Sequence, residues 1–165
     1  GWTKITLGFP EAKTYEQDIQ EKNIRIVFDN LTLSLMMEVN VEQFSKVLAG
    51  ILKNSMYALL KKSETVTFSP EIFLGLKVNK DMLEITIRDN GSGIDENIKD
   101  KIFAPFFTTK TTGEAAGVGL YLCREIVQNH RGTIEVESKK GEYTQFLITI
   151  PVYQPKTITP PKEEE

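Results

Sequence analysis

One long segment of the chain has a hydrophobic period unlike its surroundings, and this limits the folds that are open to it. From residue 40 to residue 62, apolar side chains recur every three or four residues, the spacing of one face of an α-helix. The predicted face consists of Phe44, Val47, Leu48, Ile51, Leu52, Ser55, Ala58 and Leu59. Asn40 is placed to cap this helix, with Gln43 at the third position of a capping box. A helix with one apolar face must pack that face on a second layer.

The segments around this helix alternate with the period of two that is typical of β-strands. Strands are predicted at 24–28, 33–39, 71–78, 83–89, 133–138 and 145–150. Turns are expected near Asn30, between the first two strands, and over 79–81. Strands paired mainly by hairpins, with helices between them, predict an α+β fold, a two-layer α/β sandwich.

A second helix is predicted over 118–129. Its buried side should carry Leu122, Cys123, Ile126 and Val127. It should close at Arg131-Gly132, where glycine can adopt the left-handed conformation that terminates helices.

Length and charge exclude several classes of protein. A chain of 165 residues with a net charge of −3 fits one domain and has no basic surface for nucleic acid or an anionic membrane. No apolar run is long enough to span a bilayer, and the single cysteine excludes an intrachain disulfide. We expect a linker or strand-like lead-in over 1–23, a folded domain over 24–151 and a disordered tail, rich in Pro and Glu, over 152–165. A cytoplasmic domain is expected, whether or not its parent protein is membrane-anchored.

Asn54 lies inside the long helix, where asparagine is unfavourable because its side chain competes for backbone hydrogen bonds. One interpretation is a solvated or locally satisfied amide. The other is an oxygen ligand for Mg²⁺, which takes few protein ligands together with phosphates and water.

The sequence Asp89-Asn90-Gly91-Ser92-Gly93-Ile94 directly follows a predicted strand. An ordinary turn is one interpretation. The second glycine suggests another, in which the backbone approaches a flat ligand closely. The Asp89 carboxylate could then accept a hydrogen bond from an exocyclic amine such as that of adenine.

Two further segments precede the second helix. Phe103 to Lys110 holds three phenylalanines around a proline, followed by two threonines and a lysine, and fits either a packed turn or a hinge into a phosphate-facing loop. Gly113 to Leu120 is either a flexible surface loop or an anion site at a helix start.

In this order, these motifs resemble the catalytic ATP-binding domain of sensor histidine kinases, in the superfamily shared with DNA gyrase, the MutL repair ATPases and the heat-shock chaperone ATPase. Residues 40–62 match the asparagine box, 89–94 and 113–120 the two glycine boxes, and 103–107 the phenylalanine box. Residues 141–146, before a final strand ending at Pro151, look like the closing glycine-threonine motif. The resemblance covers residues 24–151 and implies a Bergerat-type sandwich, with a mixed, mainly antiparallel sheet and an ATP-lid loop.

The resemblance implies a role for each matching residue. Asn54 would hold Mg²⁺ and, with Lys110, act in catalysis; Asp89 would bind the adenine amine, supported by Thr144. Gly91 and Gly93 would pass close to the base, and the loop from Lys110 to Gly117 would form the lid. The complete set implied to contact nucleotide is Asn54, Asp89, Gly91, Gly93, Ile94, Phe107, Thr108, Lys110, Gly117, Val118, Gly119, Leu120 and Thr144.

The resemblance also implies partners. Bound as ATP·Mg²⁺, the nucleotide would donate its γ-phosphate to a histidine on a separate helical hairpin of the same kinase, with a response regulator downstream in two-component signalling. The parent would be a homodimer and the isolated domain a monomer, without contacts to nucleic acid or membrane. His130, the only histidine, is expected to have a surface or capping role.

The chain departs from the family pattern at a few positions. Gly50 stands one turn before Asn54, where the family usually has a polar residue, and Ala115 and Ala116 replace the usual glycine and threonine. Tyr143 replaces a common glycine. These departures leave open a second hypothesis, a module that binds nucleotide without transferring phosphate. A hydrolytic ATPase is disfavoured, because its water-activating glutamate would belong at Gly50.

Overall fold

A computed structural model describes residues 3–7, 23–29, 33–105, 107 and 119–152. Its core is a five-stranded sheet with the strand order β2-β4-β5-β7-β6, and a separate two-stranded sheet joins β1 to β3. The elements are β1 (Thr3–Leu7), β2 (Arg25–Asp29), β3 (Leu33–Met37), α2 (Val41–Ser63), β4 (Glu71–Asn79), β5 (Met82–Asp89), the short 3₁₀ helix η2 (Lys99–Lys101), α3 (Gly119–Asn129), β6 (Thr133–Lys139) and β7 (Tyr143–Pro151).

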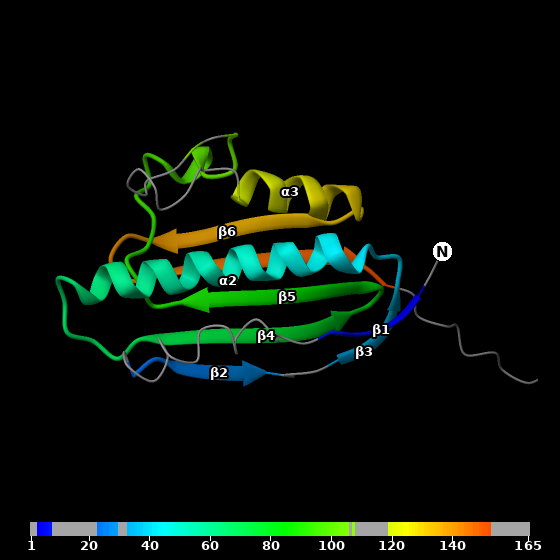
Figure 1. Cartoon of the computed structure of the whole chain (residues 1–165), viewed down its shortest axis with the longest axis horizontal. Helices are drawn as coiled ribbons and strands as arrows, with labels where there is room; N and C mark the ends of the chain where they lie inside the picture. Colours follow the sequence, from blue (N-terminus) through cyan, green and yellow to red (C-terminus); the bar gives the residue numbers. More distant parts are fainter. Residues whose placement is uncertain (1–2, 8–22, 30–32, 106, 108–118, 153–165) are drawn as a thin grey trace, which may run out of the picture.

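The two long helices cover one face of the five-stranded sheet. Figure 1 shows α2 and α3 side by side over that face, with α2 against β5 and α3 against β6. Along β5 and β7, alternate residues are buried beneath the helices, which is the period of two seen in the sequence. The two-layer α+β sandwich with a mixed, mainly antiparallel sheet is therefore confirmed.

The pairing of the first strands differs from the prediction. A turn near Asn30 was expected between these two strands, but they are not partners: β2 pairs in parallel with β4, and β3 pairs with β1 in the other sheet. Parallel neighbours need a crossover connection, commonly a helix, and α2 lies in the connection from β2 to β4. Local alternation identified strands here without revealing their neighbours.

The start of α2 confirms the predicted cap and corrects the capping box. The Asn40 side-chain oxygen accepts a hydrogen bond from the Gln43 amide at 3.0 Å. The Asn40 backbone N–H donates to Nε2 of His130 at 2.9 Å. In a capping box, the Gln43 side chain would accept this hydrogen bond. A distant histidine thus joins the end of α3 to the beginning of α2.

The predicted buried face of α2 is largely confirmed: all its members are buried except Ala58, which is half-buried, and Met56 is buried as well. The corresponding prediction for α3 is partly wrong. Cys123 and Val127 are buried and Ile126 packs against the core, but the Leu122 side chain is 50% exposed. Residues 123 and 127 are one turn apart, so they define the inner face, and Leu122 is rotated about 100° away from Cys123.

The end of α3 also differs from the prediction. The left-handed residue is Arg131, with φ 62°, and not Gly132. The Gly132 amide donates to the Val127 carbonyl and the Arg131 amide to the Gln128 carbonyl, both at 2.9 Å, which is the Schellman pattern. Gly132 is required for space, because a Cβ there would lie 2.4 Å from the Thr149 carbonyl oxygen of β7.

The domain extends slightly beyond its predicted end. Val152, assigned to the tail, is buried, and its amide donates to the Asp81 carbonyl at 2.8 Å. The remainder of the predicted tail, 153–165, lies outside the described residues, as does most of the lead-in. Within the described residues, neither helix combines the length and apolar character required to cross a membrane.

Candidate functional site

The buried polar side chains of the described residues gather in one place. They are Ser55 on α2, Asp89 at the end of β5, Thr144 near the start of β7 and Ser138 near the end of β6. Elsewhere the buried side chains of this core are apolar. Because burying polar groups is unfavourable without compensation, such a cluster within an apolar core marks a candidate functional site.

Strand register aligns three members of this cluster. Ser138 pairs with Thr144 across β6 and β7, and Thr144 pairs with Asp89 across β7 and β5. The hydroxyls of Ser138 and Thr144 are 3.0 Å apart. We call Ser138, Thr144 and Asp89 the polar row; two of its members, Asp89 and Thr144, were predicted site residues.

Asp89 is almost fully buried, with 2% of its surface exposed. Its carboxylate accepts a hydrogen bond from the Gly91 amide at 2.9 Å, the one such bond from the described residues. Burial raises the pKa of Asp89 to about 7, although the Gly91 amide, the Ser55 hydroxyl, Lys62 and Arg88 each lower it. The carboxylate is therefore short of hydrogen-bond donors.

Ser55 lies beside Asp89 on the α2 side of the site. Its hydroxyl is close enough to influence the carboxylate. It nevertheless makes no hydrogen bond of good geometry within the described part of the chain. A buried hydroxyl in this state is unusual, and its free energy would fall if a water or ligand supplied a partner.

The segment after Asp89 is fixed by contacts with neighbouring elements. The Asn90 side chain accepts from the Glu71 amide at 2.7 Å and donates to the Ser69 carbonyl at 2.8 Å. The Lys62 ammonium donates to the Asn90 carbonyl at 2.9 Å. Asn90 is thereby used to hold the segment to β4 and α2, which makes it a structural residue.

Gly91 and Gly93 are both required by contacts inside the protein. A Cβ on Gly91 would lie 2.6 Å from the Ala58 backbone, where Ser92 donates to the Ala58 carbonyl at 3.1 Å. Gly93 has φ 66°, and a Cβ there would lie 2.2 Å from the Lys139 carbonyl oxygen. Packing against α2 and against the turn after β6 accounts for these glycines, and their closeness to a base stays a prediction.

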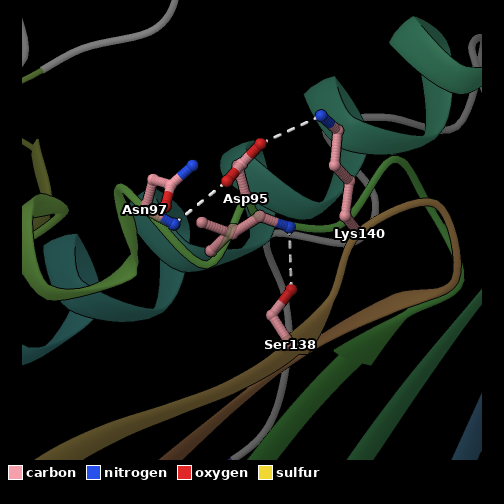
Figure 2. A network of polar contacts seen from close by, with 5 residues as sticks. Asp95, Asn97, Ser138 and Lys140 are labelled. Atoms are coloured by element: carbon pink, nitrogen blue, oxygen red, sulfur yellow. Dashed lines mark hydrogen bonds and ion pairs between the residues drawn. The ribbon is translucent and has the colours of Figure 1, made fainter.

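The turn between β6 and β7 holds the same segment from the other side. The Ile94 amide donates to the Ser138 hydroxyl at 2.8 Å, and the Gly141 amide donates to the Ser92 carbonyl at 2.7 Å. Figure 2 shows the Lys140 ammonium reaching the Asp95 carboxylate at 3.0 Å, with the Asn97 amide on the other oxygen of Asp95. The segment is therefore fixed to a hairpin that carries two residues of the polar row.

Asn54 is half-buried on α2, one helical turn before Ala58, and its side chain makes no hydrogen bond to a described residue. Its amide oxygen is thus available to a ligand, as the metal-ligand hypothesis requires. Within the described residues there is no group of three His, Cys, Asp or Glu side chains that could hold a metal by itself. A cation here would depend on ligand oxygens and water.

Gly50, the departure from the family pattern, faces α3. A Cβ at this position would lie 3.2 Å from the Cys123 sulfur, and the Cys123 thiol points to the Val47 carbonyl at 3.8 Å. Burial raises the pKa of Cys123 to about 12, so the thiol stays protonated. The glycine therefore allows close contact between α2 and α3.

The other predicted site residues divide into two groups. Ile94, Phe107 and Leu120 are half-buried and pack against the core. Gly119 is the first residue of α3, and a Cβ added there would have open space around it. Thr108, Lys110, Gly117 and Val118 lie outside the described residues, as do Ala115 and Ala116.

Sequence reasoning missed Ser138 and gave Ser55 only a place in an apolar face. For Ser138 a clue was present, because it is the buried position in the otherwise half-buried or exposed β6. Tyr143, a departure from the family pattern, is a surface residue whose hydroxyl donates to Glu137 at 2.7 Å and whose ring contacts Arg88.

Comparison with known proteins agrees with this geometry. Residues 40–154 match the family model described as "Histidine kinase-, DNA gyrase B-, and HSP90-like ATPase". Sporulation kinase E of Bacillus subtilis is 35% identical over 167 residues, covering 91% of this chain, and cyanobacterial phytochrome A of Nostoc sp. is 42% identical over 86 residues, covering 51%. This chain spans only 21% and 11% of their lengths. The catalytic domain of histidine kinase ThkA superposes with a TM-score of 0.72 at 28% identity, covering 92% of this chain and 95% of that one.

Proposed function

This chain belongs to the histidine kinase-, DNA gyrase B- and HSP90-like ATPase family, and we propose that it binds ATP and donates the γ-phosphate to a histidine on a separate phosphoacceptor domain. One observation carries the proposal: the buried carboxylate of Asp89, short of hydrogen-bond donors, lies in the polar row beside the conformationally fixed segment 90–95. A response regulator downstream and a homodimeric parent complete the proposal.

The chemistry of Asp89 favours adenine. The exocyclic amine of adenine supplies N–H donors, which the carboxylate needs, whereas guanine presents a carbonyl oxygen at the corresponding position. A hydrogen bond to a charged group contributes about 1.5–3 kcal/mol, and a carboxylate facing a carbonyl loses it. Thr144, paired with Asp89 across the sheet, would support the same contact directly or through water.

Asn54 is the residue proposed to hold Mg²⁺ against the phosphates. Its amide is free of hydrogen bonds to described residues, and an amide oxygen is a suitable ligand for a hard cation. When bound, Mg²⁺ would neutralise phosphate charge. Asn54 would orient the phosphates relative to the base site, because it lies one turn along α2 from Ala58, which packs on Gly91. Lys110 is proposed as a further cationic partner of the phosphates.

The acceptor histidine must lie on another domain, because His130 is unsuited to the role. Both ring nitrogens already bond to the protein, Nε2 to the Asn40 amide and Nδ1 to the Ile126 carbonyl. His130 also follows the far end of α3, so about 15 Å of helix separates it from the first turn, where the phosphates would bind. In-line transfer needs reacting atoms about 3–3.5 Å apart.

Calorimetry with ATP and GTP tests the base site. We expect the wild-type chain to prefer ATP, and Asp89→Asn to weaken ATP binding by roughly ten- to a hundredfold. Asp95→Asn is the matched control, because Asp95 is a nearby carboxylate already bonded to Lys140 and the Asn97 amide. Equal affinity for ATP and GTP would remove Asp89 from this role.

A transfer assay tests the reaction. The chain alone should show almost no acid-labile labelling from γ-labelled ATP, whereas adding its own phosphoacceptor hairpin should produce labelled histidine on that hairpin. Measurable ATP binding without any labelling of the hairpin would favour the alternative of a binding module.

A further inference from the structure

Three hydrogen bonds meet at the Ser138 hydroxyl, and together they determine which atom donates in each. The partners are the Ile94 amide at 2.8 Å, the Tyr143 carbonyl at 2.7 Å and the Thr144 hydroxyl at 3.0 Å. A serine hydroxyl has one proton and two lone pairs. The carbonyl can only accept, so the proton goes there, and the amide can only donate, so it occupies one lone pair. The remaining lone pair faces Thr144, which must be the donor.

This arrangement determines what Thr144 can offer a ligand. Its one hydroxyl proton is directed to Ser138, so only lone pairs remain for other partners. Thr144 is buried, with 4% of its surface exposed, and lies opposite Asp89 in the β5–β7 register. The Asp89 carboxylate is also an acceptor when ionised. The polar row therefore presents acceptors side by side, and it is complementary to a group with more than one N–H.

We propose that Ser138 is a positioning residue that holds the Thr144 hydroxyl as an acceptor and thereby selects a 6-amino purine over a 6-oxo purine. The inference rests on the proposed function, since it takes Asp89 and Thr144 as the base site. The 6-amino group offers two N–H donors, whereas a 6-oxo group offers only an acceptor. Without Ser138 the Thr144 hydroxyl could rotate and donate, so a carbonyl would be disfavoured by Asp89 alone.

ATP and inosine triphosphate are the probes, because they differ at the 6-position of the base, including the N1 proton that accompanies the carbonyl. We expect wild-type protein to prefer ATP in calorimetry, and Ser138→Ala to reduce the ratio of the two affinities by roughly tenfold. Ser138→Cys is a second variant of nearly unchanged size, whose thiol is a weak donor and acceptor, and it should reduce the ratio as well. Thermal unfolding identifies which variants remain folded.

Two comparisons separate positioning from a general structural effect. Lys140 lies in the same hairpin as Ser138, and Lys140→Ala removes its ion pair with Asp95 but leaves Ser138 intact. The affinity ratio should therefore stay at its wild-type value. In a Thr144→Val background, Ser138→Ala should leave the ratio unchanged, because Ser138 acts through the threonine hydroxyl.

Each outcome has one interpretation. A wild-type ratio in folded Ser138→Ala and Ser138→Cys overturns the inference and leaves ATP binding intact. A ratio that still falls in the Thr144→Val background also overturns it, and assigns the effect to the Ile94 and Tyr143 contacts of Ser138. Failure of the wild-type chain to bind ATP at all would instead overturn the proposed function, and this inference with it.

Discussion

The two ends of α2 contain a similar combination of a polar turn and a titratable side chain, but they differ in whether the polar groups have partners. At the first end, His130 uses both ring nitrogens on the protein and packs against the Phe44 ring at a centroid distance of 5.9 Å. At the other end, Asp89 accepts one hydrogen bond from the described residues, and the Ser55 hydroxyl has none of good geometry. The helix places Ser55 about 20 Å along its axis from Asn40.

This difference separates structure from function more clearly than residue type does. A lone histidine attracts attention as a catalytic group, yet here it caps and joins two helices. A buried aspartate with too few donors destabilises the unliganded protein, and such a residue is retained where a ligand supplies the missing contacts. The comparison therefore predicts opposite effects of mutation at the two ends.

The largest expected effect is on the pH dependence of stability, through Asp89. Its pKa is raised from 3.8 to about 7 in the folded protein, so folding favours its protonated form. The native state then binds more protons than the unfolded state between these values, and the free energy of unfolding falls as pH rises from about 4 to about 7. The decrease from this group should be on the order of 4 kcal/mol.

Asp89→Asn should remove this dependence and make the protein more stable than the wild type at pH 8, while weakening ATP binding. Urea unfolding of both proteins at several pH values measures the difference. Asp95→Asn is the control, because the Asp95 carboxyl should change the pH dependence of stability in the opposite direction. Contacts with the Asn97 backbone amide and Lys140 lower the pKa of that exposed carboxyl. If the free energy of unfolding changes equally with pH in wild type and Asp89→Asn, the carboxylate is not destabilised by burial.

Much of the fold could be predicted because it depends on local periodicity. The face of α2, its Asn40 cap and the strands of both hairpins follow from residues close in sequence. The partners of β2 and β3 could not be predicted this way, because both form across long stretches of chain. The left-handed residue at the end of α3 was misassigned for a related reason, since Gly132 is needed by Thr149 on a distant strand.

The residues of the candidate site also divide into those that nearby sequence identifies and those that depend on distant parts of the chain. Asp89 stands at a strand end followed by glycines, and that motif can be recognised locally. Ser138 and Ser55 belong to the site only through strand register and the packing of α2 on the sheet. The partnership of His130 with Asn40 spans 90 positions, so nothing near either residue predicts it.

The second prediction concerns the start of α2, where the polar groups of His130 and Asn40 have partners. His130→Ala removes two hydrogen bonds and the ring contact with Phe44, so it should lower the free energy of unfolding by about 1–3 kcal/mol. ATP affinity should not change, because the candidate site on α2 lies about 20 Å along the helix from Asn40. Asn129→Ala, at an exposed neighbouring position, is the control and should be nearly neutral. A loss of ATP affinity in folded His130→Ala would end the proposed separation of the two ends.

The smallest expected effect on stability, and the most specific on function, comes from Asn54. Alanine has a higher helix propensity, and the Asn54 side chain makes no hydrogen bond to a described residue, so Asn54→Ala should stabilise the fold by about 0.5 kcal/mol. The same variant should reduce the magnesium dependence of ATP binding and leave adenosine binding unchanged, since the proposed base contacts lie on the sheet and the proposed Mg²⁺ ligand lies on α2. Calorimetry with and without Mg²⁺ measures this, with the exposed Lys53→Ala as control. If Asn54→Ala keeps the full magnesium dependence, another side chain holds the ion. If adenosine binding weakens equally, the phosphate and base contacts are not separable, and Asn54 then belongs with Asp89 as part of a single site.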